Sequence, residues 1–552
     1  MIRYSLRKFF FLLLIFCGKH GFGQPVFQNL YGGVNQEISL VALPCPSGGI
    51  YYLGATTSTG SGDADPVLMK LDDNGQVVWA HAIGGVNYDV AGAMTLASDG
   101  GLACAGSTKS FNGNTIDDLY FFKTDSMGGM LWSKTFSTSD LDVASAIIRT
   151  SDNGFAITGF TYVMGLKKVL LIRTDSNGDT LFTRIYGGTS HDQGVELCQT
   201  SDGGFLITGK TFSQSLGESD IMLIRTNSLG DLLWAKSYGE VHWDEGAGIM
   251  QLQDGNYLLS GSTISFGQGD FDILLMKTDT SGNILWGKTY GGTKTDACYT
   301  ARENADGSIV TSGYSNSMGY GHRLRMGSQP EVESGDRGDD STNLFLMKVD
   351  AVGDTIWTRS YGDGAQDEAF HFAKMGNGDY IIPGFTTSYT NFTDSTQMLL
   401  IRTDSMGHSG CHEQDSRPII DTTNFITQTL VFTQSGGITV NNVVSNVLAW
   451  NISAEDACLF IKVEGNLEDD ADVLVFPNPA GNQISVSSKQ LVINSISICN
   501  VLGELVSVVN LPIANYPLHA VIDVSQLPND IYFLKISSST SNITKKIIIQ
   551  KN

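Results

Sequence analysis

Short apolar segments follow one another from residue 27 to about residue 406, and each ends at a polar turn. Residues 205–209 read FLITG and residues 221–225 read IMLIR, which is typical of buried strands and too short for average helices. Turns such as Asp202-Gly203-Gly204 separate the segments, and Asp-Gly supplies the positive φ angles of a tight hairpin. This part of the chain is therefore predicted to be all-β.

The segments belong to a unit that occurs seven times. Each unit starts with a pair of small residues, usually Gly-Gly, and successive pairs are 52, 53, 50, 52, 52 and 71 residues apart. The pairs, or their substitutes, are Gly32-Gly33, Gly84-Gly85, Ser137-Thr138, Gly187-Gly188, Gly239-Glu240, Gly291-Gly292 and Gly362-Asp363. Each unit reads as four strands. The last interval contains a polar, charged insertion, around residues 321–343, which we expect to be a loop and a candidate partner contact.

Four antiparallel strands per unit of about 50 residues predict a seven-bladed β-propeller over residues 24–410. An open β-solenoid is the alternative. The chain starts with a strand at residues 26–31 that matches the fourth strand of the unit, and the seventh unit lacks its fourth strand. A ring closed by this strand exchange leaves no exposed edge, which favours the propeller.

An acidic residue stands four positions after the second residue of every pair. The seven residues are Glu37, Asp89, Asp142, Asp192, Asp244, Asp296 and Asp367. In a closed ring they form a circle of carboxylates, which is suited to a hard cation such as calcium. The alternative is that each carboxylate accepts backbone N–H groups in its own turn, and we expect this architectural role because every blade has the residue.

The other chemistry-bearing residues do not form a recognisable site. His191 and His242 stand beside two of these carboxylates and are expected to be exposed loop residues. The sequence contains no nucleophile elbow, Walker loop, HExxH motif or paired-carboxylate signature, so it gives no positive reason to assign an enzyme, and no cofactor is predicted. The net charge of −23 makes nucleic acid and anionic membranes poor partners.

The N-terminal residues 1–23 read as a secretory signal peptide. Arg3, Arg7 and Lys8 precede a short apolar run, and Gly21 and Gly23 precede a candidate cleavage site. We find no later apolar run of 18 residues, so no transmembrane segment is expected in the mature chain.

The repeat ends near residue 410. Residues 411–470 retain strand-like runs and are interpreted as a linker segment with strands. Cys411 and Cys458 flank it, and in an exported protein they are the expected disulfide. The remaining mature cysteines show no metal-type spacing.

Residues 471–552 are interpreted as a separate small β-sandwich-like domain. Pro477-Asn478-Pro479, then Asn500, Leu502 and Gly503, then Leu527-Pro528 and Tyr532, occur in order ahead of a basic chain end. This arrangement resembles the type A C-terminal sorting domain of type IX secretion cargo, although Asp530 stands where that family usually has Gly. The resemblance implies recognition by the type IX machinery and secretion, or attachment to the outer surface of a Gram-negative cell.

Three functions remain open. The first is a secreted binding platform for glycan or protein ligands. The second is an extracellular hydrolase or lyase with a site at the mouth of the propeller channel, and the third is a structural coat component. A catalytic set should break the sevenfold symmetry at that mouth, whereas the sequence shows only a uniform acidic ring.

Overall fold

The computed structural model describes most of the chain. It covers residues 25–33, 35–111, 116–138, 140–318, 342–363, 365–388, 396–423, 425–450, 452, 454–459, 473–476, 483–488, 493–500, 505–510, 518–538 and 542–549. The expected signal peptide and nearly all of the insertion lie outside these residues. The chain divides into two compact units, residues 1–459 and 460–552.

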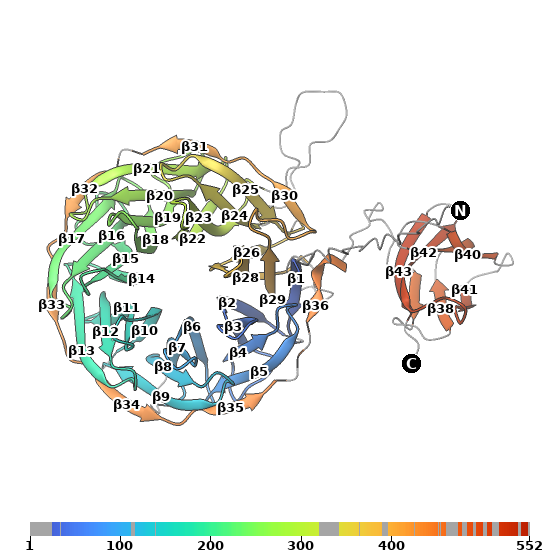
Figure 1. Ribbon diagram of the computed structural model, residues 1–552, viewed down its shortest axis with the longest axis horizontal. Coiled ribbons are helices and arrows are strands. Elements are labelled where there is room, and N and C mark those ends of the chain that lie inside the picture. The colour runs from blue at the N-terminus through green and yellow to red at the C-terminus, as the bar shows by residue number, and fades with distance from the viewer. Residues whose placement is uncertain are drawn as a thin grey trace, which may run out of the picture. The chain divides into compact units, whose positions relative to one another are not determined.

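The first unit is a ring of seven antiparallel sheets (Figure 1), which confirms the predicted seven-bladed propeller. From the axis outward, blade one contains β2(Glu37–Pro44), β3(Ile50–Thr56), β4(Asp65–Leu71) and β5(Val77–Gly84). Blade two contains β6(Asp89–Leu96), β7(Leu102–Thr108), β8(Asp118–Thr124) and β9(Met130–Ser137). Blade three contains β10(Asp142–Arg149), β11(Phe155–Val163), β12(Leu166–Thr174) and β13(Thr180–Gly187). Blade four contains β14(Asp192–Gln199), β15(Phe205–Thr211), β16(Asp220–Thr226) and β17(Leu232–Gly239). Blade five contains β18(Asp244–Gln251), β19(Tyr257–Thr263), β20(Asp272–Thr278) and β21(Ile284–Gly291). Blade six contains β22(Asp296–Glu303), β23(Ile309–Ser315), β24(Asn343–Val349) and β25(Thr355–Tyr361).

The seventh blade joins the two ends of the repeat region, as the sequence predicts. It contains β26(Asp367–Ala369) and β27(Ala373–Lys374), then β28(Tyr380–Thr386), β29(Gln397–Thr403) and the N-terminal β1(Phe27–Tyr31). Strand β1 is antiparallel to β29, with Leu30 opposite Leu399, so the first strand supplies the missing fourth strand.

A repeated hydrogen bond joins neighbouring blades, from a tyrosine on the fourth strand of one blade to a glycine in the turn between the third and fourth strands of the next blade. The Tyr31 hydroxyl donates to the carbonyl of Gly75 at 2.7 Å, across the boundary where the ring closes. Tyr238 makes the same bond to Gly282 at 2.7 Å, between blades four and five. The closing boundary therefore uses the same contact as an internal one. The tyrosines are fully buried, and apolar clusters continue from each blade into the next.

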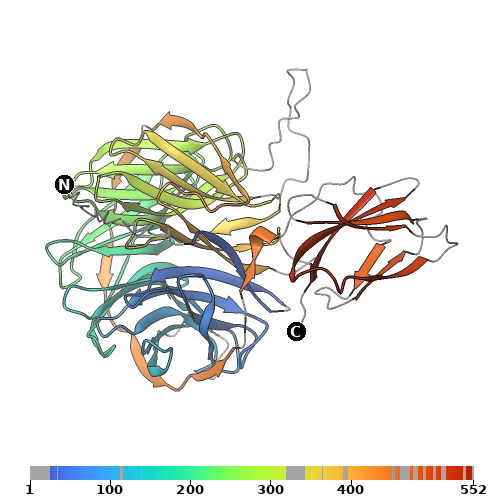
Figure 2. The same ribbon diagram turned by 45° about the vertical axis from the view of Figure 1, so that its right-hand side comes forward.

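Residues 413–456 differ from the linker that the sequence suggests, because their strands complete the blades. The strands are β30(Glu413–Asp415), β31(Ile419–Thr422), β32(Ile426–Thr429), β33(Thr433–Ser435), β34(Thr439–Val443), β35(Asn446–Ala449) and β36(Glu455–Asp456). They pair in turn with the outer strands of blades six, five, four, three, two, one and seven. We call residues 413–456 the belt, because they make one circuit of the rim (Figures 1 and 2).

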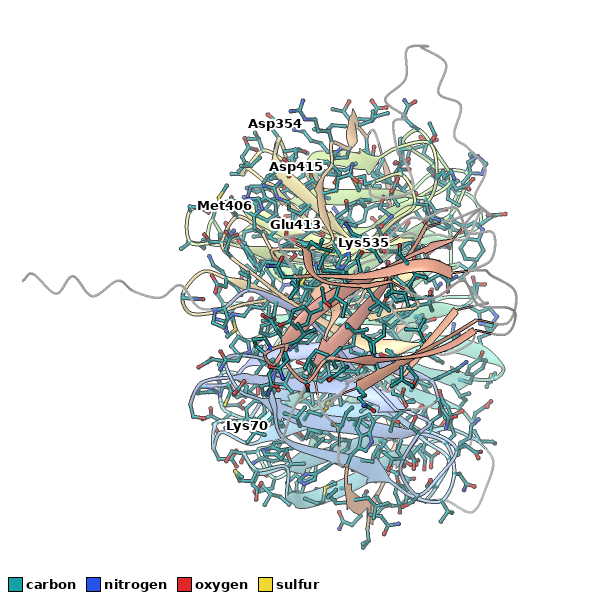
Figure 3. The ribbon with its side chains drawn as sticks, turned by 90° about the vertical axis from the view of Figure 1, so that its right-hand side faces the viewer. Lys70, Asp354, Met406, Glu413, Asp415 and Lys535 are labelled. Atoms are coloured by element: carbon teal, nitrogen blue, oxygen red, sulfur yellow. A yellow bond between two sulfur atoms is a disulfide. The ribbon has the colours of Figure 1, made fainter. Side chains whose placement is uncertain are left out.

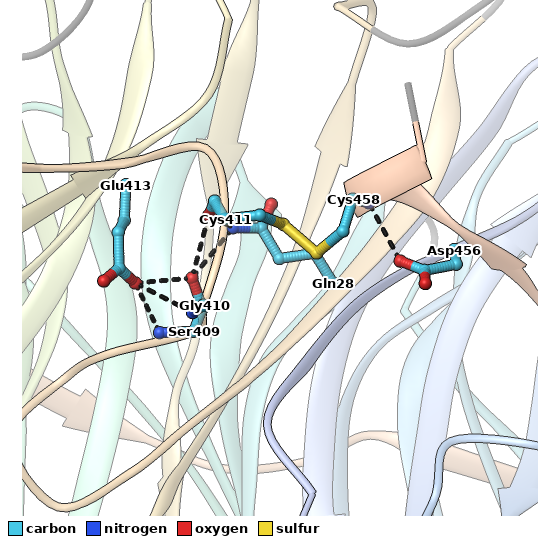
Figure 4. The surroundings of a disulfide bond; sticks show 7 residues. All are labelled: Gln28, Ser409, Gly410, Cys411, Glu413, Asp456 and Cys458. Carbon is cyan, nitrogen blue, oxygen red and sulfur yellow. Dashed lines mark hydrogen bonds between the residues drawn. A yellow bond between two sulfur atoms is a disulfide. The ribbon is translucent and has the colours of Figure 1, made fainter. Parts of the chain in front are cut away.

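A disulfide joins the two ends of the belt. Cys411 and Cys458 are bonded, and the second lies in the short 3-10 helix η1(Ala457–Leu459) (Figure 4). Gln28 of β1 donates to the Cys411 carbonyl, so the N-terminal strand also holds this junction. At the sixth blade Arg359 Nη1 lies 2.7 Å from Asp415 Oδ1, an ion pair between the blade and the belt strand that carries Asp415 (labelled in Figure 3). The result is a covalent hoop around the seven blades.

The second unit contains two small antiparallel sheets. One has the order β37(Val473–Phe476), β38(Gln483–Ser488) and β41(Leu518–Asp523). The other has the order β40(Leu505–Asn510), β39(Ile493–Asn500), β42(Asp530–Ser538) and β43(Asn542–Ile549). Ile484, Ile498, Leu534 and Ile547 are among the residues of its own apolar core. Within the described residues, no helix is long and apolar enough to cross a membrane.

Candidate functional site at the mouth of the channel

The seven predicted carboxylates are the first residues of the seven inner strands, so they lie at one face of the propeller. The segments that link one blade to the next reach this face, and so do the turns between second and third strands. We call this face the mouth. All seven carboxylate residues are fully buried.

Each of these carboxylates is held by its own blade. Asp192 accepts hydrogen bonds from the Gly188 amide at 2.8 Å, from the Thr211 hydroxyl at 2.5 Å and from the Ser213 hydroxyl at 3.0 Å. Corresponding bonds hold the other six, listed here with the backbone donor of each: Glu37 (Gly33), Asp89 (Gly85), Asp142 (Thr138), Asp244 (Glu240), Asp296 (Gly292) and Asp367 (Asp363). These bonds tie the turn that enters each inner strand to the end of the second strand.

A second set of polar residues, which the sequence reasoning missed, occupies equivalent positions at or near the starts of the third strands, and all of them except the partly buried Gln397 are buried. In chain order they are Asp65, Asp118, Lys168, Asp220, Asp272, Asn343 and Gln397. Burial, with the next blade's carboxylate as a further cause, raises the pKa of Asp220 and of Asp272 to about 6. The Asp at the head of the third strand is visible in the sequence, because it recurs in four of the seven units.

The mouth also has a pocket that breaks the symmetry, formed by blades three, four and five. Its cavity of about 320 Å³ is lined by aromatic and basic side chains. The Phe212 and Trp243 rings lie 5.6 Å apart at 82°, and Phe212 and His191 lie 6.4 Å apart at 86°. The lining residues are Tyr162, Lys167, His191, Asp192, Gln193, Lys210, Phe212 and Trp243, and we call this set the aromatic–lysine pocket.

Two lysines supply positive charge to this pocket in a strongly acidic protein. Lys210 Nζ lies 2.7 Å from Glu245 Oε1 and 5.8 Å from the centre of the Trp243 ring. Lys167 Nζ lies over the Phe160 ring at 4.4 Å. Burial and the charge of Lys210 lower the pKa of Lys167. Flat rings beside ammonium groups suit a ligand that has both an apolar face and polar edges.

His191 is half-buried in this pocket, not exposed as the sequence suggested. The backbone N–H of Lys167 donates to His191 Nδ1 at 3.0 Å, so the neutral ring has its proton on Nε2. His242 is exposed, as expected. Within the part of the chain that the structure describes, no group of three or more His, Cys, Asp or Glu residues forms a metal centre.

The opposite side of the mouth is apolar. A cavity of about 530 Å³ is lined by Ile38, Val90, Val143, Phe370 and Phe385, among other residues of blades seven, one, two and three. Ile38, Val90 and Val143 are equivalent to Gln193 and Glu245 of blades four and five, and Phe385 is equivalent to Lys210. The strands that line the channel are therefore equivalent in every blade, but the side chains at matching positions are apolar on one side and polar on the other.

Three charged or titratable groups lie on or next to inner strands, namely Glu196 in β14, Arg302 in β22 and His371 between β26 and β27. Burial, together with the charge of Arg302, lowers the pKa of His371 to about 3. Burial raises the pKa of Glu196, and the same arginine opposes this effect. These residues come from blades seven, six and four, so they too break the symmetry.

The predicted sorting residues are only partly described. Pro477, Asn478, Pro479, Leu502 and Gly503 lie outside the described residues. Asn500 ends β39 opposite Tyr532 of β42, and the Tyr532 hydroxyl donates to the Pro528 carbonyl at 3.3 Å. Leu527 is buried in the core of the second unit.

Residues 474–550 match a family model described as the secretion system C-terminal sorting domain. This match confirms the resemblance found in the sequence. The chain is type IX secretion cargo that carries a propeller, and such cargo is secreted or attached to the outer surface of Gram-negative bacteria.

Other relatives are distant. The chain is 27% identical over 143 residues to the regulatory protein FlaEY of Caulobacter vibrioides, a match that covers 25% of this chain and 14% of that protein. Sqt1 of Chaetomium thermophilum superposes with a TM-score of 0.37 at 9% identity, over 69% of this chain and 98% of that one. A eukaryotic initiation factor gives a TM-score of 0.27 at 10% identity, over 62% of this chain and 97% of that one.

Proposed function

We propose that the exported propeller is a recognition platform that binds glycan or protein ligands at its mouth. The observation that carries the proposal is the break in symmetry there. The scaffold residues recur from blade to blade, whereas the aromatic–lysine pocket draws different side chains from three successive blades. Residues that differ among equivalent positions are free of the scaffold's requirements and are available for a ligand.

Glycan is the ligand class that fits the aromatic–lysine pocket best. A pyranose ring has an apolar face that stacks on flat side chains such as Trp243 and Phe212, and its hydroxyl groups need donors and acceptors at the edges. His191 Nε2 and Lys210 are donors, and Gln193 is both donor and acceptor. The two lysines favour sugars that carry a carboxylate or a sulfate.

Binding of the full mature chain to glycan and extracellular-protein arrays tests the proposal. We expect Trp243→Ala and Lys210→Gln each to weaken a bound glycan by about tenfold or more, equivalent to about 1.4 kcal/mol. Lys236→Gln is the matched control, because Lys236 lies over Trp234 at 5.8 Å on the outer strand of the same blade, the same distance as in the Lys210–Trp243 pair. Equal loss in all three variants, or no ligand on either array, would contradict the platform.

The channel residues support a second candidate, an extracellular hydrolase or lyase. Glu196, Arg302 and His371 are non-equivalent, titratable or charged, and coupled through the arginine. A screen on polysaccharides and peptides with the mature chain and a Glu196→Gln variant tests this candidate. Turnover that the variant loses supports it, and absence of turnover on every substrate leaves the binding platform.

A further inference from the structure

Buried aspartates meet in pairs at four of the seven blade boundaries. In each pair one carboxylate starts the third strand of a blade and the other starts the inner strand of the next blade. The pairs are Asp65 with Asp89, Asp118 with Asp142, Asp220 with Asp244, and Asp272 with Asp296. All eight residues are at most 2% exposed. Two buried like charges in contact are costly unless something neutralises them.

The inner-strand members of the pairs are satisfied, but three of the four third-strand members have a buried oxygen without a partner in the part of the chain that the structure describes. Asp244 accepts bonds from the Glu240 amide and from the Thr263 and Ser265 hydroxyls. Asp220 Oδ2 accepts a long bond of 3.3 Å from the Leu216 amide, and its Oδ1 has no hydrogen-bond partner among the described residues. Asp65 Oδ1 and Asp118 Oδ2 are likewise buried without a partner.

The unpartnered oxygen faces its neighbour over a glycine. A Cβ built on Gly239 would collide with Asp220 Oδ1 and would lie 3.0 Å from Asp244 Oδ2, so both oxygens converge on the side of that Cα. Gly84 and Gly291 stand in the same place between their own pairs. The buried Ser237 hydroxyl lies close enough to Asp220 to lower the pKa of that carboxyl, and it adds a third oxygen at this boundary.

The boundary between blades three and four shows that a positive charge can occupy the space beside the inner-strand carboxylate. There the third-strand residue is Lys168, and its ammonium lies 2.8 Å from the Gly188 carbonyl, 2.7 Å from the Ser190 carbonyl and 3.5 Å from Asp192 Oδ2. The protein therefore places its own cation against the inner-strand carboxylate at this boundary. The corresponding carbonyls between blades four and five belong to Glu240 and His242.

We infer that the four aspartate pairs bind hard divalent cations, with calcium as the ion, which take the place that the Lys168 ammonium fills between blades three and four. The ligands are carboxylate, hydroxyl and carbonyl oxygens, the set that calcium prefers and that tolerates irregular geometry. The remaining two boundaries pair a carboxylate with the neutral Asn343 or Gln397 and need no cation. The uniform ring of seven carboxylates is thus scaffold, and the sites arise only where a second aspartate faces it.

Calcium content and thermal melting of the full mature chain test this inference. We expect about four calcium ions per chain after dialysis against micromolar calcium, and a melting temperature several degrees higher with calcium than with a chelator. Asp220→Lys copies the Lys168 boundary, and Asp220→Asn copies the Asn343 boundary. Each should bind about one ion fewer. Glu218→Gln is the control, because it removes an exposed carboxylate two residues away and should change neither readout.

The alternative is that each pair shares a proton. In that case no calcium is retained, and the melting temperature is insensitive to calcium but falls as the pH rises from 4 to 6. That result overturns the inference, as does calcium binding that Asp220→Lys and Asp220→Asn leave intact. If Asp220→Lys does not fold, Asp220→Asn and the ion count of the unmodified chain still decide the question.

Discussion

Loss of the Cys411–Cys458 disulfide should loosen the belt and destabilise the propeller. The bond closes a loop whose ends are 47 residues apart in sequence. On the chain-entropy model such a loop stabilises the folded state by about 4 kcal/mol at 25 °C, because the unfolded chain loses the freedom of its loop ends. The double variant Cys411→Ser/Cys458→Ser should therefore lower the free energy of unfolding by about that amount.

The structure also indicates where the loss appears. The belt strands are short, largely exposed and held mainly by backbone pairing to the fourth strands, so their amides should exchange much faster once the ends are free. The second and third strands are buried on both faces and should change little. Denaturant unfolding and hydrogen exchange of the oxidised protein, the reduced protein and the double variant measure both effects.

Two controls make this test specific. The double variant should be insensitive to reductant, and Cys198→Ser, which removes a free thiol within the fourth blade, should keep the reductant response of the unmodified chain. A loss below about 1 kcal/mol, or unchanged exchange in residues 413–456, would refute the view that the closed belt constrains the ring.

Three further predictions concern closure, the acidic ring and export. Deleting residues 24–33 should lower stability by several kcal/mol, since β1 and the Tyr31–Gly75 bond are lost; an unchanged melting temperature would contradict closure by strand exchange. Asp192→Ala should destabilise by about 1–2 kcal/mol with or without calcium, because Lys168 already faces this carboxylate; a calcium-dependent loss in thermal melts would argue against that reading. Removing residues 471–552 should leave a folded propeller in the periplasm, and fractionation that finds the truncated chain in the medium or on the surface would rule this out.

The propeller could be predicted from sequence because its scaffold recurs. Each blade must bury the same strands, fill the same turns and satisfy the same carboxylate, so the same residue types return about every 52 residues. Strand exchange followed from one unmatched strand at residues 26–31. The sequence predicted strands within residues 411–470, but it did not predict that these strands pair with the outer strands of the blades. Belt strands such as β31 and β33 are exposed on all residues, so backbone pairing sets them and leaves little pattern in the side chains.

The candidate sites were harder to predict for a geometric reason. Tyr162, Lys210 and Trp243 are far apart in sequence and meet only because successive blades lie side by side in the ring. Other blades have different residue types at the equivalent positions, so an alignment of the repeats does not single these residues out. The aspartate pairs were missed differently. Each member of a pair recurs in the sequence, but the two members belong to neighbouring blades. An analysis that takes the repeats one at a time therefore does not show that they lie close together.

Hydrogen exchange of the mature chain with and without a glycan selected from the array tests the platform most directly. The account predicts slower exchange at the mouth, in residues 160–167, 191–193, 210–212 and 243–245, with the opposite turns such as 175–179 and 227–231 unaffected. Trp243→Ala should abolish this protection at the same ligand concentration. Protection confined to the belt, to the opposite turns or to the sorting domain would contradict the assignment of the mouth as the binding surface.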